Sequence, residues 1–435
     1  MKSLAILYLT GVVAAGIIDK RQFGADFEKS LWSLFGVTKN KTETPLFTTK
    51  TLTPQFDPKA KRELLIWGPF QLQPANGTHK AVPNVVKLDK LSDVITTRVK
   101  GMCRECMVLY AQADVSDKTG KKMDIDKGVY SHHVIMADVG RVMVPVPAFA
   151  KCPDGSIGGF NFDPAKMAGG GMGGAGGKAG HGDAGHGKSM LKKRQFAGSV
   201  DPKMIDMLKT PGGQAMMAKM MPAISIFVGQ GDDGTAMRYA APKGSVIKSG
   251  FHIGKNDEMN LMSEVVNYDN AVKDIYVSLD YEYIPMPGKV EDGWYDTGNA
   301  ALNVQPCGGL DLMFPPKDKA IKYTSPPWDV IMPGYLLDIK PHLHDGGINV
   351  TLSVNGKVEC VSSAVYGAGA EVKGEKWETI TGYTPCNKAI EIKPGDKLAM
   401  DSTYDVTSHK LRPTSDNHGE AEGMAFAQFT FAVKR

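Results

Sequence analysis

The sequence lacks the short motifs that mark several common enzyme classes. It contains no Gly-x-Ser-x-Gly nucleophile elbow, no Gly-rich loop ending in Gly-Lys-Ser/Thr, and no dinucleotide fingerprint that opens a helix. The glycine tract at 169–177 has neither the preceding strand nor the following helix that phosphate binding requires. Nothing in the chain therefore indicates a serine hydrolase, a P-loop nucleotidase or a nicotinamide-dependent dehydrogenase.

Strong charge of one sign and long apolar runs are also missing. The formal net charge is +4 over 435 residues, so we expect no nucleic-acid partner. Beyond the N-terminus no stretch reaches the roughly 18 uninterrupted apolar residues of a transmembrane helix, so no membrane partner is expected after signal removal. A hydrophobic content of 42% and a charged content of 23% are typical of a globular protein. The length predicts two or three domains.

The first residues indicate export. Residues 1–15 combine one lysine, an apolar run and small residues, which predicts a signal peptide, with residues 16–21 as a propeptide. Lys20-Arg21 is a dibasic site for a processing protease, and Lys193-Arg194 is either a second such site or a chance pair. Sequons at Asn40, Asn76 and Asn349 predict glycosylation in a secreted protein.

The chain has 6 cysteines, an even number that in an exported protein indicates disulfides. We expect Cys360 and Cys386 to pair, since they flank the hairpins of the last domain. The sequence does not order the other four, which are Cys103, Cys106, Cys152 and Cys307.

Strand patterns dominate the chain, and no long stretch has the 3.6-residue period of a helix. Residues 273–285, for example, alternate apolar and polar side chains as a half-buried strand does. The fold class is therefore all-β. We expect a flexible lead-in at 22–61, then a first β-sandwich at 62–293 and a second at 294–435.

A Gly/Met-rich insertion at 153–222 interrupts the first domain. Its low-complexity core cannot bury enough surface to order itself. Two interpretations stay open: its methionines, with His181 and His186, capture Cu(I), or they only pack a short helix in a flexible segment.

The stretch from 334 to 360 carries the clearest candidate site. In a strand, His342 and His344 project from the same face, and two imidazoles side by side form half of a copper or zinc site. Asp345-Gly346-Gly347 is a turn signal, and Asn355-Gly356 predicts a hairpin turn after the following strand. The His-x-His pair is thus predicted at the rim of an antiparallel sheet.

Two further features carry possible ligands. His132 and His133 are adjacent on a predicted strand, so both reach one metal only where the strand bends or bulges. In the closing strand, Met424 and Phe426 share one face with Gln428 and Thr430, while the alternate residues share the other. A methionine in such a place is more often core than ligand.

In chain order, His132-His133, the Val-Asn-Tyr strand at 266–268, His342-x-His344 and a late Glu-Gly-Met at 422–424 resemble the copper type II, ascorbate-dependent monooxygenases such as peptidylglycine alpha-hydroxylating monooxygenase. The segments at 103–113 and 132–136, at 266–270 and 277–285, and at 341–360 look more specifically like the stress-up-regulated nodulin-nineteen family of secreted proteins. This resemblance covers about 62–152 and 223–433. It implies two antiparallel jelly-roll β-sandwich domains in tandem.

Residue by residue, the resemblance assigns His342, His344 and Met424 to a mononuclear copper site in the second domain. It assigns His132 and His133 to an electron-supplying copper in the first domain. That site's third histidine is replaced by Asn267, and an amide binds copper poorly, so the first site is incomplete. His252 is a conceivable substitute. Ascorbate would be the reductant of an enzyme of this type.

Three hypotheses about function follow. The first is a secreted monooxygenase-like protein with one copper site, acting in copper binding or in oxidative chemistry on an unknown substrate. The second is a non-enzymatic secreted or cell-wall-associated stress-related protein with a vestigial metal site. The third is a zinc protein that adds His409 or His418 to His342 and His344, with Asp345 as the nearest candidate base.

Overall fold

The computed structural model describes residues 42–74, 76–79, 91–124, 127–141, 144, 146–153, 224–230, 236–288, 290–307, 313–372, 375–411 and 423–434. All regular elements in these ranges are β-strands, arranged in three open sheets, so the all-β prediction is confirmed. Within the same ranges there is no helix long and apolar enough to cross a membrane. The predicted signal peptide, propeptide, both dibasic sites, Asn40 and nearly all of the 153–222 insertion lie outside the described residues.

A five-stranded sheet and the first half of a ten-stranded sheet build the first lobe. The smaller sheet has the order β1 (Glu43–Thr44), β4 (Ser92–Val99), β11 (Met259–Asn267), β6 (Val129–Asp138), β8 (Ser225–Gln230). The larger one runs β2 (Leu46–Leu52), β3 (Lys61–Leu72), β12 (Lys273–Pro285), β5 (Cys106–Ser116), β10 (Lys248–Ile253), β13 (Trp294–Asn303), β22 (Ala425–Lys434), β16 (Gly334–Leu343), β20 (Ile390–Ile392), with β9 (Met237–Arg238) beside β5.

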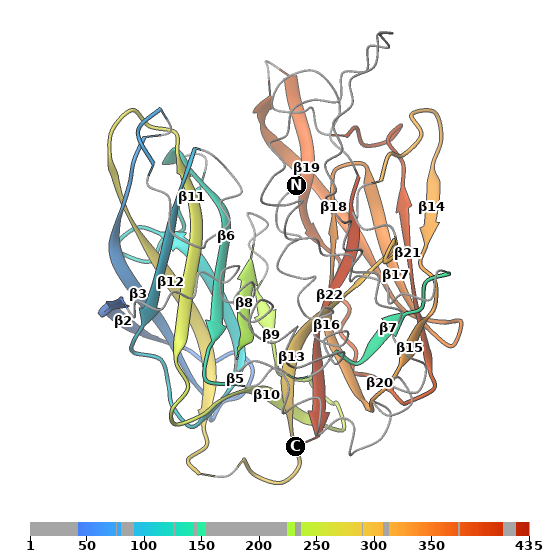
Figure 1. Cartoon of the computed structure of the whole chain (residues 1–435), viewed down its shortest axis with the longest axis horizontal. Coiled ribbons are helices and arrows are strands. Elements are labelled where there is room, and N and C mark those ends of the chain that lie inside the picture. The colour runs from blue at the N-terminus through green and yellow to red at the C-terminus, as the bar shows by residue number, and fades with distance from the viewer. Residues whose placement is uncertain are drawn as a thin grey trace, which may run out of the picture.

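A seven-stranded sheet completes the second lobe. Its order is β19 (Glu375–Tyr383), β18 (Lys357–Val372), β17 (Gly347–Val354), β21 (Lys397–Tyr404), β15 (Trp328–Val330), β7 (Ala148–Ala150), with β14 (Ile321–Thr324) beside β21. The two lobes and the strands shared between them are visible in Figure 1.

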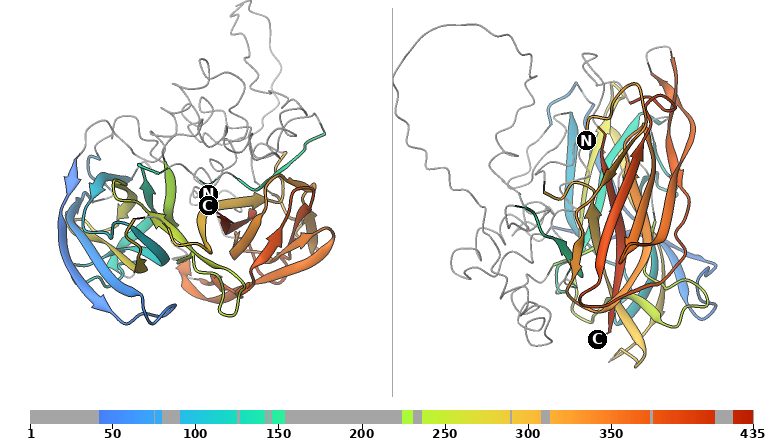
Figure 2. Two further views of the ribbon diagram at one scale, coloured as in Figure 1. Left: turned by 90° about the horizontal axis from the view of Figure 1, so that it is seen from below. Right: turned by 90° about the vertical axis from the view of Figure 1, so that its right-hand side faces the viewer.

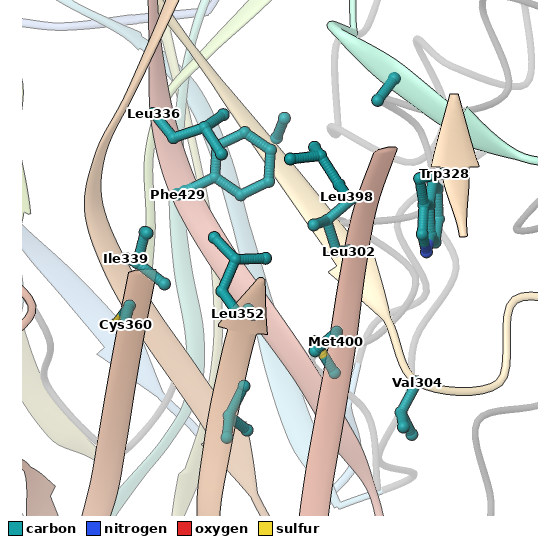
Figure 3. Packing of buried hydrophobic residues seen from close by; sticks show 14 of the residues in the cluster. Leu302, Val304, Trp328, Leu336, Ile339, Leu352, Cys360, Leu398, Met400 and Phe429 are labelled. Carbon is teal, nitrogen blue, oxygen red and sulfur yellow. The ribbon is translucent and has the colours of Figure 1, made fainter. Parts of the chain in front are cut away.

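The ten-stranded sheet is common to both lobes. Its first half packs against the five-stranded sheet around a core that includes Trp67, Phe251 and Tyr281. Its second half packs against the seven-stranded sheet, where Leu302, Leu336 and Phe429 meet Leu352, Leu398 and Met400 (Figure 3). The halves join through parallel pairing of β10 with β13, and these strands lie between the lobes in Figure 2. The finer prediction of two jelly rolls in tandem stays a prediction, as do the predicted domain boundaries.

Two local expectations need correction. The predicted flexible lead-in contains β1 and β2, because a Thr-rich segment finds partners in β4 and β3. Strand β7 falls inside the predicted first domain, yet it pairs with β15 and its residues lie in the core of the second lobe.

The cysteines form three disulfides. Cys360 pairs with Cys386, as expected from the sequence. Cys103 pairs with Cys106, and Cys152 pairs with Cys307, which links the end of the β7 segment to the chain after β13.

Candidate metal centre

The His-x-His pair lies at the end of β16, beside the start of β22. Pro341, His342 and Leu343 face Ala427, Phe426 and Ala425 in antiparallel register. Leu343, Ala425 and Ala427 belong to the core of the second lobe, so the alternate residues point to the opposite face. The predicted division of the closing strand into two faces is therefore confirmed.

His344 and Met424 continue this register by one position. The His344 amide lies 3.3 Å from the Met424 carbonyl oxygen. Residues directly opposite each other in an antiparallel pair project from one face with Cβ atoms about 5 Å apart. The structure thus brings the backbones of His344 and Met424, 80 residues apart in the chain, side by side next to the His342–Phe426 pair.

Packing around the two histidines is close. The rings of His342 and Phe426 stack with centroids 4.7 Å apart, and the His342 and His344 rings meet edge to face at 5.6 Å. Both histidines are half-buried, whereas Met424 is only 1% exposed. The two imidazoles are therefore partly open to solvent, whereas Met424 is not.

This face of the sheet looks toward the first lobe. Farther along β22, the Gln428 amide contacts the Met237 sulfur at 3.5 Å, and the Thr430 hydroxyl donates to the Arg238 carbonyl at 3.0 Å. In β16 the register shifts between Leu337 and Lys340, which is a bulge three residues before the histidines. The candidate centre therefore lies just beyond the contact of the second lobe with β9.

Three tyrosine hydroxyls hold the backbone around the histidines. The Tyr404 hydroxyl accepts from the amides of His344 (3.1 Å) and Met424 (2.9 Å) and donates to the Met424 carbonyl (2.5 Å). The Tyr383 hydroxyl accepts from the Leu343 amide at 2.9 Å. The Tyr366 hydroxyl accepts from the Gly346 amide and donates to the Gly347 carbonyl, both at 2.9 Å.

Burial raises the pKa of Tyr404 and of Tyr366, so both hydroxyls keep their protons and can donate as well as accept. Sequence analysis missed these tyrosines. Their strands are distant in the chain from the histidines, and no short-range motif marks them.

Asp345 has a structural place in the turn. Its Oδ1 accepts from the Ile380 amide at 3.1 Å, which fastens the turn to β19. Gly346 follows with a φ of +91°, a conformation that favours glycine. His409 stacks on Tyr366 with ring centroids 3.6 Å apart, and its Nδ1 lies 3.7 Å from a Glu378 oxygen.

The zinc hypothesis finds no third ligand among the described residues. In those ranges no group of three His, Cys, Asp or Glu residues is placed to hold a metal ion. His418 lies outside them. A set of two imidazoles and one thioether is a different kind of donor set, and it fits copper, whose Cu(I) form prefers soft sulfur ligands.

The paired histidines of the first lobe lie on β6 opposite β11. The register between these strands shifts so that Glu264 faces His133 and Val265 faces Ser131, which leaves His132 at a bulge. The bulge that a shared ligand role requires is therefore present in the backbone. His133 is buried, with Nε2 3.7 Å from Glu264 Oε2, and the other Glu264 oxygen accepts from the Ser92 hydroxyl at 2.8 Å.

The other first-lobe candidates serve different contacts. Asn267 is buried, and its amide bonds to the backbone of the β11–β12 turn. His252 lies on β10, opposite Met107, and its backbone amide donates to Asp296 at 3.2 Å.

Comparison with known proteins agrees with the resemblance seen in the sequence. Residues 315–412 match the model of the family described as Stress up-regulated Nod 19. Two curated fungal proteins are each 27% identical over 213 residues, which is 48% of this chain: the probable copper-dependent oxygenases M1 of Phoma sp. and clz3 of Cochliobolus lunatus. The match spans 51% of the first and 64% of the second.

Among solved structures, two crystal forms of PNGF-II share 8% and 10% identity with the chain. They cover 89% and 96% of it, and 65% and 71% of their own chains, with TM-scores of 0.32 and 0.29.

Proposed function

We propose that this chain, with its Stress up-regulated Nod 19 segment and its similarity to probable copper-dependent oxygenases, is a secreted, monooxygenase-like copper protein. Its one mononuclear copper site would consist of His342, His344 and Met424. The observation that supports the proposal is the contact between the His344 amide and the Met424 carbonyl, which extends the register of β16 and β22 by one position beyond the His342–Phe426 and Leu343–Ala425 pairs. The two β-sandwiches would be jelly rolls in tandem.

His342, His344 and Met424 would hold the copper, which would supply one-electron chemistry between its Cu(I) and Cu(II) states. The surrounding residues hold the three ligands in place. Phe426 restricts the His342 ring by stacking, burial keeps Met424 away from water, and the tyrosines fix the backbone that carries His344. Ascorbate would serve as reductant if the protein is an enzyme; the substrate is unknown.

The first lobe favours a second candidate function, copper binding without turnover. Asn267, in the place of the third histidine, is bonded to its own turn, so the side chain there serves the fold. Without a second redox centre, a two-electron oxidation lacks its store for the second electron. The same copper site would then bind the metal in a non-enzymatic secreted protein.

Metal content of the secreted protein tests the site. We expect one copper per chain after purification under ascorbate, lost in His342→Ala and strongly reduced in Met424→Leu. Matched controls are His79→Ala, whose ring pairs with Asp93 at 3.0 Å, and Met400→Leu, which is equally buried in the second core. Equal copper in Met424→Leu and Met400→Leu, or zinc that survives Met424→Leu, would contradict the proposal.

Ascorbate-driven oxygen consumption separates the two candidate functions. An enzyme consumes oxygen at a rate that His342→Ala abolishes, whereas a binder holds copper and shows no consumption above free copper ions.

A further inference from the structure

Among the three tyrosines, Tyr404 is the one whose hydroxyl bonds to the backbone of both His344 and Met424. Its hydroxyl accepts hydrogen bonds from the amides of His344 and Met424 and donates one to the Met424 carbonyl. The hydroxyls of Tyr383 and Tyr366 bond to the backbone of residues 343, 346 and 347, on the histidine side. One oxygen atom thus joins the histidine ligand segment to the methionine ligand segment.

The direct bond between these segments is weaker than the tyrosine bridge. The His344 amide lies 3.3 Å from the Met424 carbonyl, whereas the hydroxyl makes bonds of 2.5, 2.9 and 3.1 Å. Ladder pairing ends one residue earlier, at Leu343 and Ala425. Beyond the last ladder pair, the hydroxyl therefore joins His344 and Met424 through shorter bonds than the direct amide–carbonyl contact does.

The Tyr404 ring itself is held firmly. The side chain is fully buried in the second core, and its ring meets Tyr323 edge to face at 6.3 Å. Tyr404 also ends β21, whose neighbours β17 and β14 fix its backbone. The rigid ring therefore fixes the rim of the ten-stranded sheet, at His344 and Met424, relative to the seven-stranded sheet.

We propose that Tyr404 is a positioning residue that sets the distance between His344 and Met424 and thereby controls whether the thioether reaches a metal held by the histidines. The proposal rests on the copper site proposed above. Since Cu(I) depends on the soft sulfur ligand more than Cu(II) does, Tyr404 would tune the preference of the site for the reduced ion.

The test is a set of three conservative variants, Tyr404→Phe, Tyr383→Phe and Tyr366→Phe, each lacking one hydroxyl. We measure Cu(I) and Cu(II) affinity by competition with chelators and copper–sulfur scattering by X-ray absorption. Tyr404→Phe should weaken Cu(I) binding by about 10-fold or more, as loss of a supporting hydrogen bond typically does, with little change for Cu(II) and a diminished sulfur signal. The other two variants should leave the Cu(I)/Cu(II) ratio and the sulfur signal unchanged.

Hydrogen exchange in the unaltered protein gives a second measurement should Tyr404→Phe fold poorly. The amides of His344 and Met424 both donate to the Tyr404 hydroxyl, so both should gain protection when Cu(I) is added. Protection of only one of the two amides would overturn the proposal. So would a Tyr404→Phe protein whose copper–sulfur signal and Cu(I)/Cu(II) affinity ratio equal those of Tyr366→Phe. Either result leaves the copper site itself intact. Absence of copper from the unaltered protein overturns the site and this proposal together.

Discussion

The buried side chain of Asn267 uses both its amide nitrogen and its amide oxygen to hold the backbone of a turn. Its Nδ2 donates to the carbonyls of Ala271 at 2.8 Å and Leu72 at 3.4 Å, and its Oδ1 accepts from the Asp269 amide at 3.1 Å. These bonds close the turn between β11 and β12 and tie it to the end of β3. An asparagine at this position is thus explained by the turn, with no need of a metal.

Asn267→Ala should therefore lower the free energy of unfolding and leave copper untouched. Removing the side-chain amide leaves buried backbone groups without hydrogen-bond partners, which costs about 1–3 kcal/mol. Urea unfolding measures the loss, and elemental analysis of the folded protein measures the copper. Asn349→Ala, at a half-buried position in β17, is the control and should cost less. Loss of copper with Asn267→Ala would show that the amide is a ligand after all.

Asp138 gives a prediction about pH. Burial, followed by the nearby Asp257 carboxylate, raises the pKa of Asp138 to about 7. Because the folded protein holds this proton more tightly than the unfolded chain, the resulting stability is complete below about pH 4 and is lost as the pH rises through 7. In the unaltered protein this contribution to the free energy of unfolding should fall by up to about 4 kcal/mol over that range.

Asp138→Asn tests this dependence, since the amide imitates the protonated carboxyl. Its free energy of unfolding should lack the decline between pH 4 and 7, so the variant becomes more stable than the unaltered protein as the pH rises. Asp257→Asn should flatten the same decline by removing the neighbouring charge. Parallel curves for all three proteins in urea titrations at several pH values would refute the assignment.

Among the elements, the β17–β18 hairpin shows sequence and structure in close agreement. Asn355 and Gly356 have φ values of +51° and +78°, as the two-residue turn predicted from Asn-Gly requires. A Cβ added at Gly356 would meet no atom within 4 Å, so any cost of a side chain there comes from the backbone conformation alone.

Gly356→Ala should consequently destabilise the protein by about 1 kcal/mol, the cost of a left-handed conformation for an L-residue. Gly382→Ala in β19 is the matched control: it also has open space around it, but no positive φ. It should be neutral or slightly stabilising. Thermal unfolding of both variants checks the difference, and equal losses would mean that the turn conformation is not what costs energy.

Strand order explains what the sequence could and could not predict. Strong alternation predicted 273–285 with the bounds of β12, and strand patterns also located β17 and β22. The pairing of β7 with β15 and of β10 with β13 depends on residues far apart in the chain, and alternation within a strand says nothing about its neighbours. The faces of His342 and Met424 followed from the two-residue period, whereas the tyrosines around them required the packed structure.

At the scale of the whole molecule, the two cores share one sheet and are joined by a buried ion pair between Arg141 and Asp296. Arg141 Nη2 donates to Asp296 Oδ1 and to the Thr297 carbonyl, both at 2.7 Å, and the guanidinium lies 3.8 Å from the centre of the Phe251 ring. Phe251 belongs to the first core, while Asp296 is on β13 of the second lobe. Arg141 therefore fastens the two lobes at the strand pair that joins them.

Arg141→Met should destabilise the protein by about 3–5 kcal/mol, because it leaves the Asp296 carboxylate buried without its counter-charge. The double variant Arg141→Met with Asp296→Asn should recover part of this loss, since the second change removes the uncompensated charge. Urea unfolding of the two single variants, the double variant and the unaltered protein forms a cycle that measures the coupling. Strict additivity would mean that the two side chains stabilise their own lobes independently, and the ion pair would then have no part in joining the cores.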